Sequence, residues 1–189
     1  RPQWSNWGGL NDATRSNVIT TGVGASEDDF GGVFGSNVMT IAPSELRNGL
    51  RISGTTTNRN YFGRAMVTYN TGTLPSGWGY MVSGSYRGGN GRTWLVPSVE
   101  GMVYQSYGIS AAVEYKASPY FTTNLMGIFS YNNRGKSAPL TQEAISLGGR
   151  NYNPNWGFQG DHIRNSKMKR ISEPLFVLSN TYHKGDTKI

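Results

Sequence analysis

Residues 61–69 of the chain read Tyr-Phe-Gly-Arg-Ala-Met-Val-Thr-Tyr. In an extended strand, successive side chains point to opposite faces. One face of this stretch is then apolar with a tyrosine at each end; its members are Tyr61, Gly63, Ala65, Val67 and Tyr69. The other face is mixed and holds Arg64. The pattern predicts a β-strand with two chemically different faces.

The same pattern recurs in residues 78–86 and 107–115 and, less cleanly, in residues 121–129. In each of them the flanking aromatic residues are eight positions apart, as Trp78 and Tyr86 are. Eight residues of strand rise about 27 Å. A tilt of about 40° reduces this to roughly 20 Å along a membrane normal, close to the apolar band of an outer-membrane barrel.

Tyrosine and tryptophan favour the membrane–water boundary because their rings are apolar and their tips hydrogen-bond to water. Repeated aromatic brackets therefore predict an all-β fold, an antiparallel transmembrane β-barrel whose bracketed faces meet outer-membrane lipid. The alternative is a soluble β-sheet protein with tyrosine-rich strands.

The composition fits a barrel with a polar but weakly charged lumen. Of the 189 residues, 26 are glycine and 15% are charged, against about 25% in soluble domains. No apolar run approaches the about 20 residues of a transmembrane helix. The chain has no cysteine, which excludes disulfides and thiol-based metal or redox sites. The net charge of +7 comes mainly from scattered basic residues, so nucleic-acid binding is not expected.

The alternation divides the chain into two expected units, residues 1–47 and residues 48–189. In the first unit we expect irregular, glycine-rich packing, with Asn11 or Asp12 capping a short helical turn over residues 13–17. The second unit holds about six strands.

The last of these strands covers about residues 174–182, and its facing is ambiguous. Either Phe176, Leu178 and Tyr182 point outward, or Leu175 and Val177 do. Before this strand, residues 141–147 have the composition of one or two helical turns.

After the first hairpin, for which we expect a tight turn at residues 57–60, the connections between the expected strands alternate in length. They are short at residues 71–77 and 117–119 and long at residues 88–103 and 132–170. Outer-membrane barrels have short periplasmic turns and long extracellular loops. If the short connections are periplasmic, the first strand rises from the periplasmic side. Residues 1–47 then lie on that side or inside the lumen.

Two groups of residues are candidates for function. Arg64, Arg87, Glu114 and Lys116 fall on the expected lumen face, where they can pair across strands or with the acidic turn of residues 27–29. In the last long loop, aromatic and amide residues form a candidate substrate-binding patch. It comprises Tyr152, Asn153, Asn155 and Trp156, with Phe158 beside them. Aromatic faces and amides suit sugars, peptides or a protein partner, and they suit simple loop packing equally well.

The sequence contains no recognisable catalytic or metal-binding pattern. The two histidines, His162 and His183, have no ligand partner at metal-binding spacing. No serine lies in a Gly-x-Ser-x-Gly nucleophile elbow. We therefore expect no enzyme activity, no catalytic residue, no metal and no cofactor.

The order along the chain is a glycine-rich segment, then the Gly-Gly…Asn-Val-Met-Thr stretch of residues 31–40, and then the alternating strands. This order resembles the plug-to-barrel junction of TonB-dependent outer-membrane receptors. Residues 7–12, 68–72 and 153–157 resemble the receptors of Bacteroidetes-type bacteria in particular. The likeness covers most of the chain, but none of these motifs is a strong signature.

The chain departs from the family pattern because it has no TonB box, no N-terminal half of a plug, and far fewer strands than the about 22 of such barrels. The resemblance therefore implies a fragment, with residues 1–47 as the end of the plug domain and residues 48–189 as the first barrel strands. The remaining strands must close the barrel, since open sheet edges in lipid leave backbone groups unpaired.

The resemblance also implies a function and a location. In that family, a barrel in the bacterial outer membrane imports a nutrient such as an oligosaccharide, a peptide or a metal chelate. A TonB-type energy-transducing protein pulls on the plug, and a surface lipoprotein lid often covers the barrel. A non-transporting outer-membrane barrel that acts as a scaffold in a membrane complex is the alternative, and a soluble β-rich binding protein is a third possibility.

Overall fold

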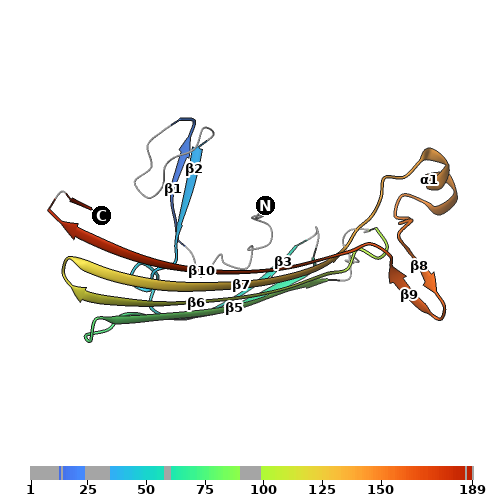
Figure 1. Ribbon diagram of the computed structural model, residues 1–189. Coiled ribbons are helices and arrows are strands. Elements are labelled where there is room, and N and C mark those ends of the chain that lie inside the picture. The colour runs from blue at the N-terminus through green and yellow to red at the C-terminus, as the bar shows by residue number, and fades with distance from the viewer. Residues whose placement is uncertain are drawn as a thin grey trace.

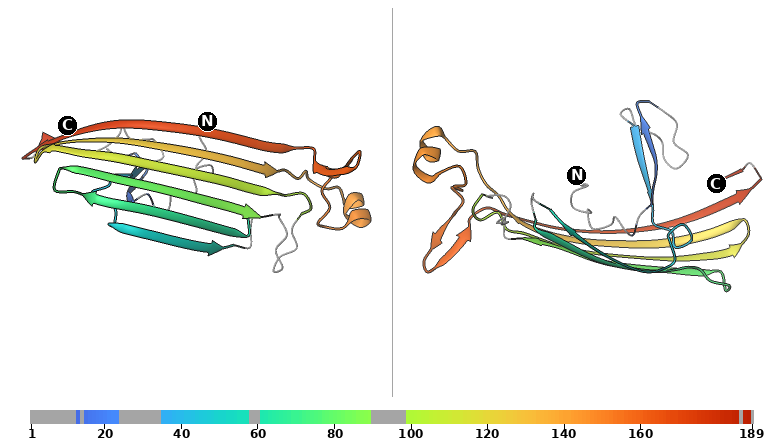
Figure 2. Two further views of the ribbon diagram at one scale, coloured as in Figure 1. Left: turned by 90° about the horizontal axis from the view of Figure 1, so that it is seen from below. Right: turned by 180° about the vertical axis from the view of Figure 1, so that it is seen from behind.

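The computed structural model describes residues 13, 15–23, 35–57, 61–89, 99–185 and 187–188. Its centre is one antiparallel sheet in the order β11-β10-β7-β6-β5-β4-β3, which Figure 2 shows strand beside strand. The strands are β3 (Gly49–Thr56), β4 (Gly63–Thr73), β5 (Trp78–Gly89), β6 (Tyr104–Ser118), β7 (Phe121–Gly135), β10 (Met168–Lys184) and the two-residue β11 (Thr187–Lys188). The expected all-β class is confirmed for this part of the chain.

The smaller elements lie outside the sheet (Figure 1). β1 (Arg15–Thr21) and β2 (Gly35–Thr40) form an antiparallel hairpin on the concave side of the sheet. The helix α1 (Gln142–Gly148) and the hairpin of β8 (Trp156–Gln159) and β9 (His162–Asn165) extend beyond one end of it. They belong to the long connection between β7 and β10.

The two ends of the sheet differ in the length of their connections, as expected. At one end, here named the turn end, residues 74–77 and 119–120 join the strands. At the other, the loop end, the connections span residues 57–62, 90–103 and 136–167. Both long loops predicted from the sequence are shorter in the structure because the strands run further than the alternation indicated. β3 begins at the turn end, where Gly49 pairs with Asn70.

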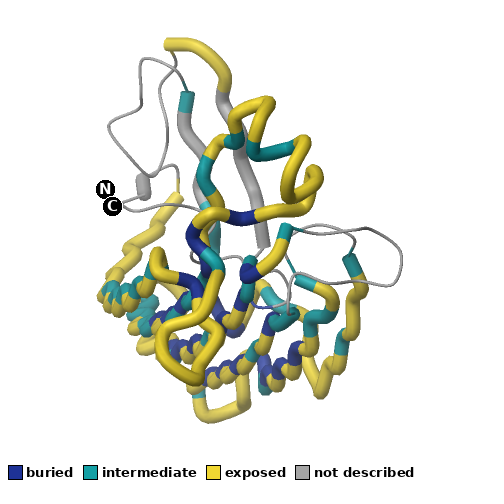
Figure 3. Tube along the Cα trace, turned by 90° about the vertical axis from the view of Figure 1, so that its right-hand side faces the viewer, coloured by how far each residue is buried: buried dark blue, intermediate teal, exposed yellow. Residues whose placement is uncertain are grey.

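The two faces of the sheet differ in burial. Along β5, exposed and buried residues alternate almost without a break. Figure 3, which looks along the strands, shows that the sheet is curved and has a convex and a concave face. In the central part of β4–β7, side chains on the convex face are mostly exposed and those on the concave face are mostly buried or half-buried, whereas β3 is exposed on both faces. A strand with one buried face has a strongly specified register, because a slip of one residue would exchange the two faces.

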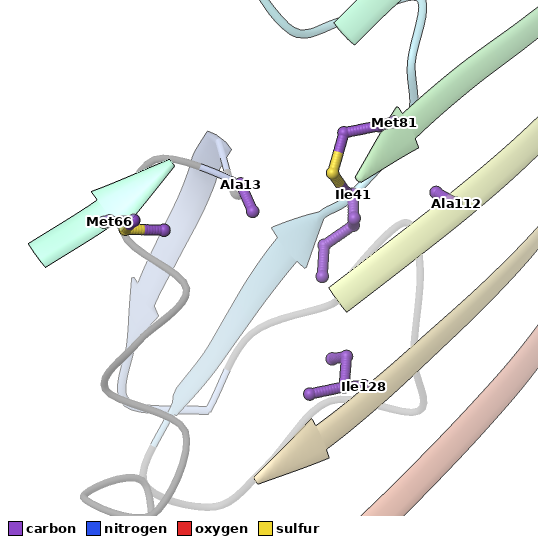
Figure 4. Close-up of a cluster of buried hydrophobic side chains, with 6 residues drawn as sticks. All are labelled: Ala13, Ile41, Met66, Met81, Ala112 and Ile128. Carbon is purple, nitrogen blue, oxygen red and sulfur yellow. The ribbon is translucent and has the colours of Figure 1, made fainter. Parts of the chain in front are cut away.

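A small apolar cluster lies on the concave face (Figure 4). It comprises Ala13, Ile41, Met66, Met81, Ala112 and Ile128. Four of these residues come from β4–β7, and Ala13 and Ile41 come from the N-terminal part of the chain. Complete burial of a methionine side chain is worth about 1.5–3 kcal/mol. Burial of Met66 and Met81 therefore helps to hold this part of the chain against the sheet.

Two expectations for the N-terminal part are wrong. The helical turn predicted over residues 13–17 is absent, because Arg15–Thr21 form β1. The run Val18-Ile19-Thr20-Thr21 is β-branched and favours an extended strand, and β2 supplies its hydrogen-bonding partner. Residues 15–21 and 35–40 are thus paired strands, with one register shift between Ser16 and Val18, and not irregular loops. Residues 1–12, 14 and 24–34 lie outside the described residues.

Two expectations for the C-terminal part can be compared with the structure. The helical turns predicted over residues 141–147 correspond to α1, whose N-cap Thr141 accepts a hydrogen bond from the Ala144 backbone N–H at 3.2 Å. In β10, Phe176 and Leu178 are exposed on the convex face, whereas Leu175 packs against the buried cluster. The first of the two facings is therefore correct.

Candidate functional site

The convex face carries an apolar band. The large exposed residues of this band have exposed fractions between 43% and 78%. They include Leu50, Ile52, Val67, Val82, Ile109, Leu125, Phe129, Phe176 and Leu178. No charged residue of the described chain lies on this face within the band. Soluble monomers rarely expose contiguous apolar patches of this kind without a function.

Aromatic residues form a row at each side of this band. Toward the loop end, Tyr86, Tyr107 and Tyr131 face one another across β5, β6 and β7, with ring centroids 5.1 and 6.4 Å apart. Toward the turn end, Trp78 contacts Tyr115 with centroids 4.5 Å apart. These residues are at least partly exposed on the outer surface, as the aromatic brackets predicted.

Tyr61 is the exception, and its predicted place on the convex face is wrong. The strand begins only at Gly63, so alternation does not extend to Tyr61. Its ring instead lies 5.5 Å from that of Tyr104, a buried residue of the concave face. The guanidinium carbon of Arg87 lies 6.0 Å from the Tyr61 ring centroid, so a cation–π contact and aromatic packing favour this position.

The four charged residues expected on the inner face all lie on the concave face, but the structure divides them into two pairs. Arg64 and Arg87 lie directly opposite each other toward the loop end. Glu114 and Lys116 lie toward the turn end on β6, with Lys116 Nζ 3.9 Å from Glu114 Oε1. The Glu114 side chain is 2% exposed and that of Lys116 is 41% exposed. The alternative partners, residues 27–29, lie outside the described residues.

Glu114 holds a segment that crosses the concave face. This inner segment, residues 41–46, connects β2 to the residues before β3. Ser44 donates to Glu114 Oε2 from its backbone N–H at 3.3 Å and from its hydroxyl at 2.8 Å. Two asparagines hold the same segment: Asn70 Nδ2 donates to the carbonyls of Pro43 and Leu46 at 3.0 and 3.1 Å, and Asn124 Nδ2 donates to that of Ile41 at 3.2 Å.

Gly79 lets the inner segment approach β5 closely. A Cβ atom at this position would lie 2.9 Å from the Cβ of Pro43 and 2.9 Å from the carbonyl oxygen of Gly72. Side chains from β4, β6 and β7 hold the segment through hydrogen bonds, whereas β5 presents its backbone at Gly79 to Pro43. The sequence analysis missed Asn70 and Asn124, although an amide on an otherwise small or apolar strand face was a usable signal.

Asparagines also organise the loop end. Asn153 Nδ2 donates to the carbonyls of Glu100 and Lys136 at 2.7 and 3.2 Å. Asn155 Nδ2 donates to the Lys136 carbonyl at 3.2 Å, and Asn165 Nδ2 reaches the same carbonyl and that of Gly101, both at 2.9 Å. Asn153 and Asn165 tie the connection between β7 and β10 to Glu100 and Gly101, and Asn155 bonds within that connection. Of the three, the sequence analysis missed Asn165.

The candidate substrate-binding patch is thus divided by burial. Asn153 and Asn155 are buried, and their amides bind backbone carbonyls, as the loop-packing alternative expects. Tyr152 is 39% exposed. Trp156 is half-buried against Gly101, where φ is +71° and the ring leaves no room for a side chain. Tyr152 and Trp156 keep accessible surface for a ligand, and a binding role for the patch stays a prediction.

Asn153→Ala tests the structural contribution of this amide. We expect a loss of about 2 kcal/mol in the free energy of unfolding, because hydrogen bonds of this kind contribute about 1 kcal/mol each. Hydrogen exchange should rise in residues 99–103 and 153–156. Asn151→Ala is the control, since Asn151 is exposed and accepts from the Glu100 N–H through its backbone carbonyl. Equal exchange in both variants would contradict this role.

The described residues include no group of three or more His, Cys, Asp or Glu side chains placed to hold a metal ion. None of the helices in this part of the chain has the length and apolar character needed to cross a membrane. Comparisons with protein family models, with curated proteins and with solved structures give no match to the chain.

Proposed function

We propose that this chain forms part of the wall of a TonB-dependent outer-membrane transporter, together with the end of its plug. The observation that carries the proposal is the convex apolar band between two aromatic rows. Trp78 and Tyr86 on β5 are eight positions apart, which is about 27 Å along the strand and roughly 20 Å along a membrane normal at a tilt of about 40°. Transmembrane β-barrels carry an apolar band of about 25 Å between aromatic girdles.

The large exposed aliphatic and aromatic residues would be unfavourable in water and favourable in hydrocarbon. The concave face is more polar, apart from the apolar cluster that includes Met66 and Met81. Its buried positions include Thr68, Ser83, Ser106, Ser110 and Ser130. A polar inner face and an apolar outer face suit a sheet with lipid on one side and a polar interior on the other.

The inner segment supports the assignment of a plug junction. It approaches β3 from the turn end, which is the periplasmic end if short turns are periplasmic. Ile41 of the segment packs in the buried apolar cluster, and Asn70, Glu114 and Asn124 hold the segment through hydrogen bonds. Such bonds contribute only about 0.5–1.5 kcal/mol each, somewhat more to charged groups. A modest force from a TonB-type protein on the plug could therefore release the segment from the wall.

The sheet edges support the presence of further strands. Among the described residues, β3 pairs with β4 alone, and β10 pairs with β7 and, near its end, with β11. An unpaired backbone group in lipid costs several kcal/mol. In this proposal, the remaining strands of the same barrel pair with the outer edges of β3 and β10.

Fractionation of cells that produce the intact protein tests its location. We expect the protein in the outer membrane and a heat-dependent change in its mobility on a gel, as folded barrels show. Recovery in the detergent-free soluble fraction would contradict the membrane assignment. Uptake of an oligosaccharide, a peptide or a metal chelate that depends on the energy-transducing protein would separate a transporter from a non-transporting scaffold.

A further inference from the structure

Arg87 occupies an unusual position toward the loop end of the concave face. The residue is 6% exposed. Its Nη2 donates to Ser106 Oγ at 2.8 Å and to Asn132 Oδ1 at 3.4 Å. Its guanidinium carbon lies 5.7 Å from the ring centroid of Tyr104 and 6.0 Å from that of Tyr61. The arginine therefore lies beside the contacting rings of Tyr61 and Tyr104 and is bound by neutral acceptors.

Two further arginines lie on neighbouring positions of the same face. Arg64 on β4 is the direct cross-strand partner of Arg87, and its Nη2 donates to Thr55 Oγ1 on the other neighbour, β3, at 3.4 Å. Arg134 on β7 is the partner of Tyr104, whose ring contacts Arg87. None of the three arginines forms an ion pair with a carboxylate within the described chain. Their positive charges are thus concentrated on β4, β5 and β7 without a partner of opposite sign there.

This arrangement is costly without an anion. Like charges directly opposite each other on a sheet destabilise it, and a buried charge requires pairing. Cation–π contacts contribute about 0.5–2 kcal/mol, but they leave the net charge unchanged. The Nε atom of Arg87 is moreover buried without a hydrogen-bond partner. Buried donors are nearly always satisfied in native structures, so this one indicates a missing acceptor.

We propose that Arg87, Arg64 and Arg134 form a binding site for a carboxylate or phosphate group. The planar guanidinium matches the paired oxygens of these anions and binds them through charge-assisted hydrogen bonds. Tyr61 is half-buried and keeps ring surface on which the remainder of a ligand can pack, whereas the buried Tyr104 ring supports Tyr61. Tyr104 also donates its hydroxyl to Asn132 Oδ1 at 3.2 Å, which fixes the acceptor that orients Arg87.

The anion has two possible sources. One is a small acidic ligand that enters from the loop end; this source rests on the proposed function and makes the imported nutrient an anion. The other is the acidic turn of Glu27, Asp28 and Asp29 from this same chain, which lies outside the described residues. Both sources supply carboxylate or phosphate oxygens to the same arginines, and they differ in whether the site is open to an added anion.

Calorimetric titration of the purified intact protein with inorganic phosphate at low ionic strength tests the site. We expect saturable binding and at least a tenfold loss of affinity in Arg87→Gln. Arg87→Lys keeps the charge but loses the planar guanidinium with its paired donors, so its affinity should lie between that of the native protein and that of Arg87→Gln. Arg64→Gln is a second variant at a less buried position, and we expect it to weaken binding several-fold. Arg170→Gln, on the exposed convex side of β10, is the matched control with unchanged affinity.

The same titration of a Glu27→Gln, Asp28→Asn, Asp29→Asn variant distinguishes the sources. Binding by the native protein assigns the site to an external ligand, and binding by this variant alone assigns it to the acidic turn. Absence of binding in both overturns the proposal, as does equal affinity in native protein, Arg87→Gln and Arg64→Gln. Phosphate binding by a protein that does not fractionate with the outer membrane would support the site and contradict the proposed function.

Discussion

Ala111→Arg is expected to lower the free energy of unfolding of the membrane-inserted protein by about 2–4 kcal/mol. Ala111 is exposed on the convex face of β6, midway between Tyr107 and Tyr115. If this face meets lipid, an arginine there must carry its charge near the middle of the hydrocarbon. In water, a surface substitution of this kind usually changes stability by less than about 0.5 kcal/mol. Denaturant unfolding of the protein in lipid vesicles measures the difference.

Gln105→Arg is the matched control, because Gln105 is exposed on the same face of the same strand. It lies beyond the Tyr86–Tyr107–Tyr131 row, between Gly88 and Asn133 in the neighbouring strands. Near the interface, an arginine costs only about 0–1 kcal/mol. A similar small effect of both substitutions would show that the convex face is in water, and the transporter proposal would lose its main support.

The convex face could be predicted from the sequence because its signal is local and repeated. A period of two assigns each side chain to a face, and aromatic residues eight positions apart mark both sides of the band. Local alternation cannot show where a strand begins, which is why Tyr61 was placed on the wrong face. Alternation also cannot show that residues 15–21 pair with residues 35–40 in a hairpin. This pairing outweighs the weak helical signal of residues 13–17.

The contacts of the concave face could not be predicted for a related reason. The sequence showed that Glu114 and Arg87 share a face, but not that Glu114 would bind Ser44, a residue 70 positions away. Asparagine side chains at Asn70 and Asn153 have several acceptable environments, including solvent, turns and backbone carbonyls. Which carbonyl each amide meets depends on the path of a distant segment, and that path has no period in the sequence.

Asn70→Asp is expected to destabilise the protein by about 3–5 kcal/mol, the range for an uncompensated buried charge. Asn70 is 2% exposed, and its Nδ2 faces the carbonyl oxygens of Pro43 and Leu46. Aspartate has nearly the same shape, but it places a carboxylate oxygen against both carbonyls and removes the donor. Repulsion should therefore detach the inner segment from β4, and hydrogen exchange in residues 41–46 should increase.

Asn180→Asp is the control for the chemistry of this substitution. Asn180 is exposed on β10, and its Oδ1 accepts a hydrogen bond from the Thr123 hydroxyl at 2.9 Å. Aspartate keeps that acceptor, so we expect a change below about 0.5 kcal/mol. If Asn70→Asp left exchange in residues 41–46 as slow as the control does, Glu114 and Asn124 would suffice to hold the segment. A plug junction released by modest force would then have to depend on those two residues.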